Sequence, residues 1–173
     1  WKNVPLDLVS EIKNDVKPNC KISVMMDCWR YDVDRLPPRS ETDIDLVRVC
    51  SYEEQLDEAL EKCRGLKDLG YEVSLNVICT SYIDVDSFVK IREKLLTEDF
   101  LDFVCFADSY GALTPDYVKK IMTLFRNMNP NVLIGFHSHD NMSMSMANTI
   151  TAIENGADMV DGTYTGIGRG GGN

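Results

Sequence analysis

The two histidines of the chain, His137 and His139, lie two positions apart in the stretch GFHSHDN (135–141). An apolar run that is typical of a strand leads into them, and residues i and i+2 of a strand point to the same face. Two neutral imidazoles side by side can bind one divalent cation, with oxygen ligands completing its shell. The spacing therefore predicts a metal site, and ordinary polar residues at a strand end are the alternative. Asp140 has the opposite parity, which favours a helix cap or a contact to a ligand side chain.

Two other stretches contain groups that suit the same site. In ADSYGALTP (107–115), Asp108 and Ser109 follow a predicted strand, where a hydroxyl and free backbone N–H groups can hold a substrate carboxylate. Asp and Ser also cap such turns, which is the structural alternative. The stretch GIGRGGGN (166–173) is rich in glycine, which permits tight turns and a close approach to a ligand, although a phosphate cradle would need a following helix. Its last residue, Asn173, could present a carbonyl oxygen to the metal.

Composition narrows the classes of partner. The chain has 18 basic and 28 acidic residues and a formal charge of −10, which disfavours binding to nucleic acid or to an anionic membrane. Its apolar runs are too short to span a bilayer. The six cysteines show no C-x-x-C pair, and most lie in or beside apolar runs, which is typical of buried, reduced thiols. We therefore expect a cytoplasmic protein, although a chain that starts at Trp1 allows no conclusion about targeting signals.

Short apolar runs rich in β-branched residues recur along the chain, and most are continuously apolar, as in strands of a parallel sheet covered on both faces. They predict strands at 21–27, 45–50, 71–79, 101–108, 131–139 and 157–163. A helix is predicted before the first strand, at 5–16. Amphipathic patterns predict further helices between strands, at 56–69 (ended by Gly70), from Thr114–Pro115 onward, and at 143–155.

The strand starts are spaced by 24 to 30 residues. Such regular alternation of strands and helices favours a TIM (β/α)₈ barrel over a doubly wound α/β sheet. Eight such units need roughly 200 to 250 residues, whereas these 173 residues supply six strands. The prediction is therefore one partial TIM-barrel catalytic domain over residues 1–173, lacking a strand at each end or two at one end.

The motifs together resemble the metal-dependent lyase and aldolase barrels related to HMG-CoA lyase. Residues 135–173 are similar to the signature G-x-H-x-H-x-N…AN…A…G-x-D-x-V-D…G-x-G-x-G-x-G-N, and 107–115 is similar to the loop after the fifth barrel strand. The resemblance covers about residues 70–173, and the earlier part agrees only in rhythm. It implies that this chain holds about strands 2 to 7, without the first strand, which carries an Arg-Asp motif, and without the eighth.

The resemblance also implies roles for particular residues. His137 and His139 would ligate a divalent metal, with Asn173 as a further ligand or neighbour, and Ser109 would hold the carboxylate of a 2-oxo acid. Mn²⁺ or Mg²⁺ is the expected metal, with Zn²⁺ as an alternative. No residue is assigned as general base; a bound water, the missing strands, Tyr110 and Tyr164 all remain open.

Details favour one branch of the superfamily. Ala107 stands where biotin-dependent carboxyltransferases have a carboxylated lysine, and the glycine-rich loop lacks the cysteine of HMG-CoA lyases. HSHDN and GIGRG differ from the H-x-H-N-D and G-I-G-E-R of the condensing synthases. HDNMSMSMANT is more similar to the HNLSL…ANS of 4-hydroxy-2-oxovalerate aldolases, from which Asp140 and Arg169 depart.

The expected function is that of a metal-dependent carbon–carbon lyase, which cleaves a 4-hydroxy-2-oxo acid through a pyruvate-type enolate. The alternatives are a Claisen-type synthase that condenses an acyl-CoA with a 2-oxo acid, and a non-catalytic metal-binding barrel. The expected partners are a small 2-oxo acid, further copies of the chain in a homo-oligomer, and an aldehyde-processing enzyme.

Overall fold

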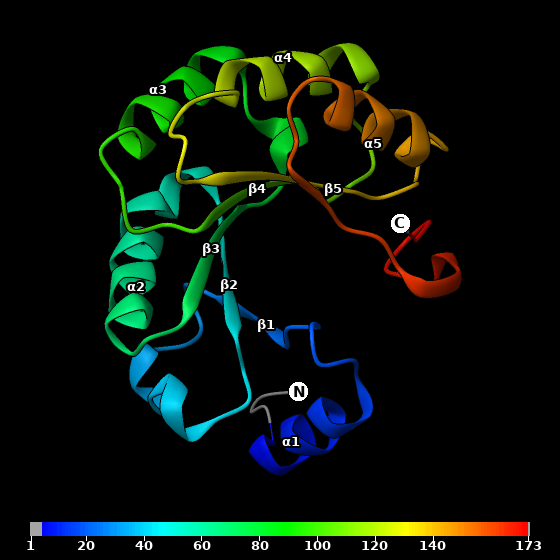
Figure 1. Cartoon of the computed structure of the whole chain (residues 1–173). Helices are drawn as coiled ribbons and strands as arrows, with labels where there is room; N and C mark the ends of the chain where they lie inside the picture. The colour runs from blue at the N-terminus through cyan, green and yellow to red at the C-terminus, as the bar shows by residue number, and fades with distance from the viewer. Residues whose placement is uncertain (1–4, 173) are drawn as a thin grey trace.

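The computed structural model describes residues 5–172 as one parallel sheet with helices packed on it. The strands follow one another in the order β1 to β6, all parallel (Figure 1). They are β1 Ser23–Asp27, β2 Leu46–Ser51, β3 Glu72–Val77, β4 Phe103–Asp108, β5 Leu133–Ser138 and β6 Met159–Val160. The helices are α1 Leu6–Asp15, α2 Leu56–Asp68, α3 Val85–Leu95, α4 Pro115–Phe125 and α5 Ser145–Glu154, and a short 3₁₀ turn, η4, spans Thr80–Tyr82.

Each predicted strand overlaps an observed one, although β2 ends at Ser51, one residue beyond its predicted end. Strand β6 is much shorter than expected because it pairs only with β5 in the described residues. The predicted helix starts and ends are close to the observed ones, including Pro115 at the first position of α4. Helix α3 was not predicted. Its signals are an Asp84 side chain that accepts the Ser87 N–H at 2.8 Å, and buried Phe88 and Ile91 one turn apart.

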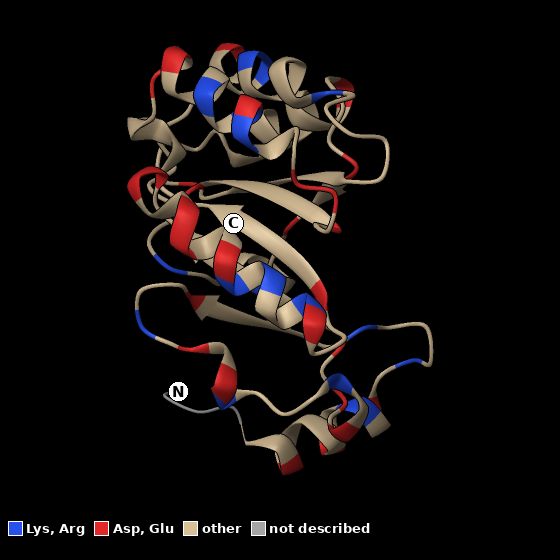
Figure 2. Cartoon of the chain, turned by 90° about the vertical axis from the view of Figure 1, so that its left-hand side faces the viewer, with Lys and Arg blue, Asp and Glu red and all other residues tan. Residues whose placement is uncertain are grey.

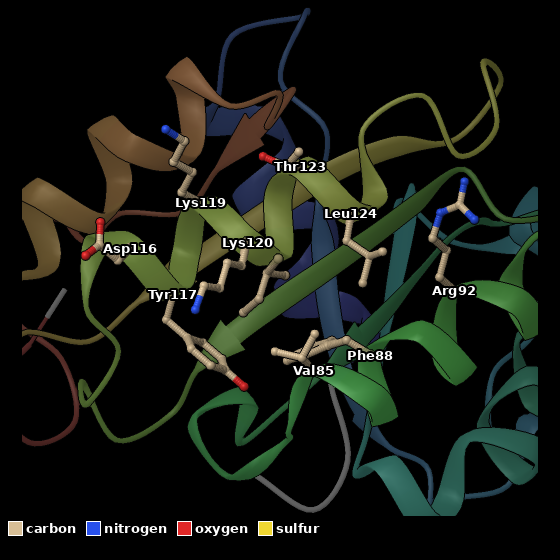
Figure 3. Close-up of a pocket in the computed structure, with 10 residues that line it drawn as sticks. Val85, Phe88, Arg92, Asp116, Tyr117, Lys119, Lys120, Thr123 and Leu124 are labelled. Carbon is tan, nitrogen blue, oxygen red and sulfur yellow. The ribbon is translucent and has the colours of Figure 1, made fainter.

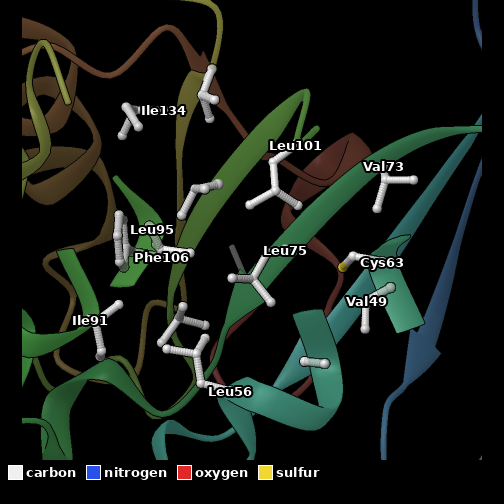
Figure 4. Close-up of a cluster of buried hydrophobic side chains, with 14 of the residues drawn as sticks. Val49, Leu56, Cys63, Val73, Leu75, Ile91, Leu95, Leu101, Phe106 and Ile134 are labelled. Atoms are coloured by element: carbon white, nitrogen blue, oxygen red, sulfur yellow. The ribbon is translucent and has the colours of Figure 1, made fainter. Parts of the chain in front are cut away.

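The main core lies between the sheet and the helices. Register aligns Met26, Val49, Leu75, Val104 and Ile134 across five strands, and all five side chains are buried. Helix residues such as Leu56, Cys63, Ile91 and Leu95 cover them (Figure 4). Full burial of each large aliphatic side chain contributes roughly 1.5 to 3 kcal/mol, so this layer holds the strands in register.

The other face of the sheet is concave and more polar. Arg48 on β2 reaches Asp161, just after β6, with an N–O distance of 2.5 Å. On a flat sheet, four strand spacings would hold β2 and β6 about 19 Å apart. The sheet must therefore curve, and Figure 1 shows α2 to α5 on its convex side. The fold is α/β, an arc of six parallel strands of a TIM barrel with helices on its convex side, and the predicted partial barrel is confirmed.

The outer surface is mixed in character. Acidic and basic residues are interspersed along the outer helices (Figure 2), whereas α5 exposes an apolar stripe of Met146, Ile150 and Ile153. None of the helices in residues 5–172 combines the length and apolar character that a membrane crossing requires. All six cysteines are free thiols, four of them buried, as the sequence analysis expected of most of them.

Candidate metal and substrate site

The two histidine rings converge at the carboxyl end of β5. His137 lies near the end of the strand and His139 directly after it. Their Nε2 atoms are 3.3 Å apart, and the ring planes cross at 72° with centroids 4.9 Å apart. Strand parity therefore places both imidazoles in one space on the concave side.

Hydrogen bonds to the Nδ1 atoms define which nitrogens face each other. His137 Nδ1 lies 3.0 Å from Asp161 Oδ2, and His139 Nδ1 lies 3.2 Å from the carbonyl oxygen of Arg169. Because a carboxylate and a carbonyl only accept hydrogen bonds, each Nδ1 carries the proton of its neutral ring. The two Nε2 atoms then direct lone pairs toward one another.

This arrangement fits a divalent cation. Two metal–nitrogen bonds of about 2.0 to 2.1 Å at roughly 90° to 109° place the nitrogens about 2.9 to 3.4 Å apart, and the Nε2 atoms of His137 and His139 are 3.3 Å apart. A cation between them would also relieve the repulsion of the facing lone pairs. A carboxylate on the far nitrogen of a histidine, as Asp161 is here, is the usual support for a metal-ligating ring.

Burial and neighbouring charges shift the pKa values of His139 and Asp161. Burial, together with the charges of His137 and Arg169, lowers the pKa of His139, so its neutral form is favoured. Burial alone would raise the pKa of Asp161, but hydrogen bonds and charges from His137 and Arg48 outweigh it, and the net pKa is lowered. Asp161 is therefore an anion that accepts the hydrogen bond from His137 Nδ1.

Arg48 extends this network across the concave face. Its guanidinium contacts Asp161 through two N–O distances, 3.1 Å and 2.5 Å, and it lies 3.6 Å from Cys105 Sγ. When the Asn76 amide oxygen is turned toward Arg48, it accepts hydrogen bonds from Nε at 3.1 Å and Nη2 at 2.9 Å. Neither Arg48 nor Asp161 was predicted as a site residue. The available signal was a charged residue in the middle of the apolar run DLVRVC.

Asp108 and Ser109 have separate roles in the loop after β4. The fully buried Asp108 carboxylate accepts the N–H groups of Ala112 and Leu113, both at 3.0 Å, so Asp108 caps the loop. Ser109 Oγ accepts the N–H of Cys79 at 2.9 Å, which leaves the hydroxyl hydrogen able to donate. Its role in holding a substrate carboxylate stays a prediction.

The glycine-rich loop packs directly on the histidine loop. The Asp140 N–H donates to the Gly172 carbonyl at 2.8 Å, and a Cβ on Gly171 would lie 2.9 Å from the Asp140 carbonyl. From the other side, a Cβ on Gly111 would lie 2.6 Å from the His139 carbonyl oxygen. The glycines thus allow close backbone contact. Asp140 Oδ1 accepts the Ser145 N–H at 2.8 Å at the start of α5, so the expected helix cap is confirmed.

Other ligands are still needed around the histidine pair. Residues 5–172 contain no cluster of three or more His, Cys, Asp or Glu side chains suited to a metal. Asn173, the third predicted ligand, lies outside the described residues. Metal binding by His137, His139 and Asn173 therefore stays a prediction.

A separate groove of about 810 Å³ lies between α3 and α4 on the outer side of the barrel arc. Phe88 and Leu124 give it an apolar floor, and Arg92, Lys119 and Lys120 lie around it (Figure 3). None of the residues at the histidine site line this groove, so it takes no part in the chemistry considered for that site.

Comparison with known proteins identifies the family to which this partial barrel belongs. The HMGL-like family matches residues 8–173, and the chain belongs to this family. A 4-hydroxy-2-oxovalerate aldolase of Bacillus cereus (strain ATCC 10987 / NRS 248) is 32% identical over 96% of this chain and 50% of its own length. An oxaloacetate decarboxylase of Mycobacterium tuberculosis is 28% identical over 75% of this chain and 38% of its own length. The chain thus spans about half, or less, of these relatives.

Solved structures show the same architecture. The N-terminal domain of a candidate aldolase from Bacteroides vulgatus superposes with a TM-score of 0.83 at 28% identity, covering 98% of this chain and 56% of that one. The carboxyl transferase domain of Rhizobium etli pyruvate carboxylase superposes with a TM-score of 0.77 at 17% identity. The match covers 93% of this chain and 30% of that one. The second similarity shows the fold alone.

Proposed function

We propose that the protein is a metal-dependent carbon–carbon lyase that cleaves a 4-hydroxy-2-oxo acid into a pyruvate-type enolate and an aldehyde. The observation that carries the proposal is the 3.3 Å separation of the Nε2 atoms of His137 and His139, with both Nδ1 atoms held by acceptors. Relatives named 4-hydroxy-2-oxovalerate aldolase support the reaction class.

A divalent cation held by His137 and His139 would polarise the 2-oxo group and stabilise the enolate. Asp161 keeps the proton of His137 on Nδ1, and Arg48 keeps Asp161 ionised and in place. The Ser109 hydroxyl would donate a hydrogen bond to the substrate carboxylate. A hydrogen bond with the Cys79 thiol raises the pKa of Tyr110, so this phenol keeps its proton at neutral pH and would act as a hydrogen-bond donor.

The test is exchange of the methyl protons of pyruvate. Full-length protein is incubated with pyruvate in D₂O with Mn²⁺, Mg²⁺ or Zn²⁺, and the methyl signal is followed by ¹H NMR. We expect exchange that requires the cation and is lost in His139→Ala. Binding of Mn²⁺ without any exchange would instead support a non-catalytic metal-binding barrel.

A second candidate is decarboxylation of oxaloacetate, which also passes through the enolate of pyruvate. The relative named oxaloacetate decarboxylase favours it. Pyruvate release from oxaloacetate and from 4-hydroxy-2-oxovalerate, measured in parallel, separates the two substrates. Consumption of acetyl-CoA in the presence of a 2-oxo acid would indicate a Claisen-type condensation instead of either.

A further inference from the structure

Aromatic side chains follow the carboxyl ends of the first four strands. Trp29 follows β1, Tyr52 follows β2, Tyr82 ends η4 after β3, and Tyr110 follows β4. Trp29 and Tyr52 have ring centroids 4.9 Å apart, and Tyr82 and Tyr110 meet edge to face at 5.2 Å. Because parallel strands end at the same side of the barrel, these four residues, here termed the aromatic row, lie along its mouth.

The aromatic row begins beside the histidine site. His139 contacts the Arg169 carbonyl at 3.2 Å, and the Arg169 guanidinium donates to the carbonyl of Ser109 at 3.2 Å. Tyr110 is the next residue after Ser109. Tyr82 lies in the turn η4 that follows β3, and β3 is two strands from β5, a separation of about 10 Å. A substrate that extends from the histidines past Ser109 would therefore reach the Tyr82–Tyr110 pair.

The turn that carries Tyr82 is firmly held. Thr80 is fully buried and donates to the Ala107 carbonyl at 2.8 Å. Cys79 has a left-handed backbone conformation with φ 57°, which is unusual for a residue other than glycine, and Ser109 Oγ accepts its N–H at 2.9 Å. Backbone strain of this kind persists where the surroundings impose it, often at ligand sites.

The rings themselves are nevertheless open to solvent. Tyr82 is 78% exposed and Tyr110 is 50% exposed. Tyr82 also lines a hollow of about 320 Å³, which Leu113 and Thr114 bound at the start of α4. A fixed edge-to-face pair with free ring surface offers a flat group both stacking and edge contacts.

We propose that the Tyr82–Tyr110 pair binds an aromatic substituent on the aldehyde half of the substrate, so that the preferred acceptors are aryl-substituted aldehydes. This inference rests on the proposed aldol function. In the synthetic direction, the enolate carbon derived from the methyl group of pyruvate forms a bond to the aldehyde carbon. The aldehyde oxygen takes up one proton and becomes the 4-hydroxyl group, so no oxidant or reductant is required.

The kinetic test uses two aldehydes that differ only in a phenyl group, propanal and 3-phenylpropanal, with pyruvate and full-length Mn²⁺-loaded protein. We expect kcat/KM to be about 3- to 10-fold higher for 3-phenylpropanal, the range for one aromatic contact. Tyr82→Ala should remove this preference by lowering kcat/KM for 3-phenylpropanal toward the value for propanal, whereas Tyr82→Phe should retain it. Leu96→Ala, an exposed apolar residue just after α3, is the control.

A binding measurement makes the inference testable without turnover. Saturation-transfer NMR with 3-phenylpropan-1-ol and propan-1-ol should show transfer to the phenyl protons, which is lost in Tyr82→Ala and kept in Tyr82→Phe. Phenyl binding without pyruvate exchange would overturn the aldol function and leave the aromatic site standing. Exchange without phenyl binding, equal use of 3-cyclohexylpropanal, or a preference for glyceraldehyde would overturn the aromatic site.

Discussion

Arg48 and Asp161 form a two-point ion pair across the concave face of the sheet, although 113 positions separate them in sequence. Both side chains are more than four-fifths buried. The pair joins the second strand to the end of the sixth, and Asp161 in turn holds the Nδ1 proton of His137. One carboxylate therefore links the curvature of the sheet to the orientation of a predicted metal ligand.

Replacing Arg48 by methionine should destabilise the protein, because it leaves the Asp161 carboxylate buried without its cation. We expect the free energy of unfolding to fall by about 3 kcal/mol, near the lower end for a buried pair that loses one partner. Urea unfolding followed by circular dichroism measures the change.

The double variant Arg48→Met with Asp161→Asn is the control for that measurement. Removing the charge as well as its partner should recover part of the loss, since no unpaired carboxylate remains. Equal stability of the Arg48→Met single variant and the unmodified protein would show that the ion pair does not stabilise the fold.

His137→Ala and His139→Ala should each weaken Mn²⁺ binding by at least about 100-fold, because each removes one of two converging nitrogen ligands. Isothermal titration calorimetry gives the affinities. Met142→Ala, at an exposed position in the same loop, should bind Mn²⁺ like the unmodified protein. A metal affinity that survives loss of either histidine would place the cation elsewhere.

Gly111→Ala should disturb the site from a distance. The new Cβ would lie 2.6 Å from both the His139 carbonyl oxygen and the Asn141 nitrogen, at a backbone φ of 57°. We expect a stability loss of about 1 to 3 kcal/mol and a Mn²⁺ affinity reduced at least tenfold, because the His139 backbone must move. Gly162→Ala is the matched control, since a Cβ there meets nothing within 4 Å; it should change neither quantity.

The acid stability of the protein should depend on Asp161. Its pKa is lower in the folded protein than the usual value near 4, because His137 and Arg48 outweigh the opposing effect of burial. A carboxyl group with a depressed pKa in the folded state stabilises the fold above its unfolded pKa, and this contribution disappears as the pH falls through the folded pKa. The Asp161→Asn variant should therefore be less stable than the unmodified protein at pH 7. Between pH 5 and pH 2 it should lose less stability than the unmodified protein does.

Urea unfolding of both proteins at several pH values tests this. Carboxyl groups distant from Asp161 titrate alike in the two proteins. The difference between the two curves of unfolding free energy against pH therefore reports on Asp161 and its immediate neighbours. Parallel curves over the acid range would contradict the assignment.

Local patterns predicted most of the fold. Continuously apolar strands and amphipathic helices depend on residues near one another in sequence, and the βα rhythm then favours a single connection scheme. The short β6 was overestimated because strand length at a sheet edge depends on pairing partners that local sequence does not describe. Helix α3 was predictable from the sequence, because it has an Asp84 cap and the apolar spacing of an amphipathic helix.

The candidate site was predictable only in part. Parity placed the two imidazoles on one side, which the structure also shows, and the cap formed by Asp140 followed from the same parity. The pairing of Arg48 with Asp161 depends on the curvature of the whole sheet, which no local pattern specifies. The direction of the Ser109 hydroxyl depends on Cys79, thirty residues earlier, which lies beside it only after β3 and β4 pair.

The apolar stripe on α5 and the outer edges of β1 and β6 have a practical consequence for handling the polypeptide. Unpaired strand edges and a row of exposed Met and Ile side chains are templates for self-association. A preparation limited to residues 5–172 should show light scattering that grows with concentration, and this colloidal behaviour would mask weak ligand binding. Quantitative titrations therefore call for low micromolar protein concentrations, with monodispersity checked before each measurement.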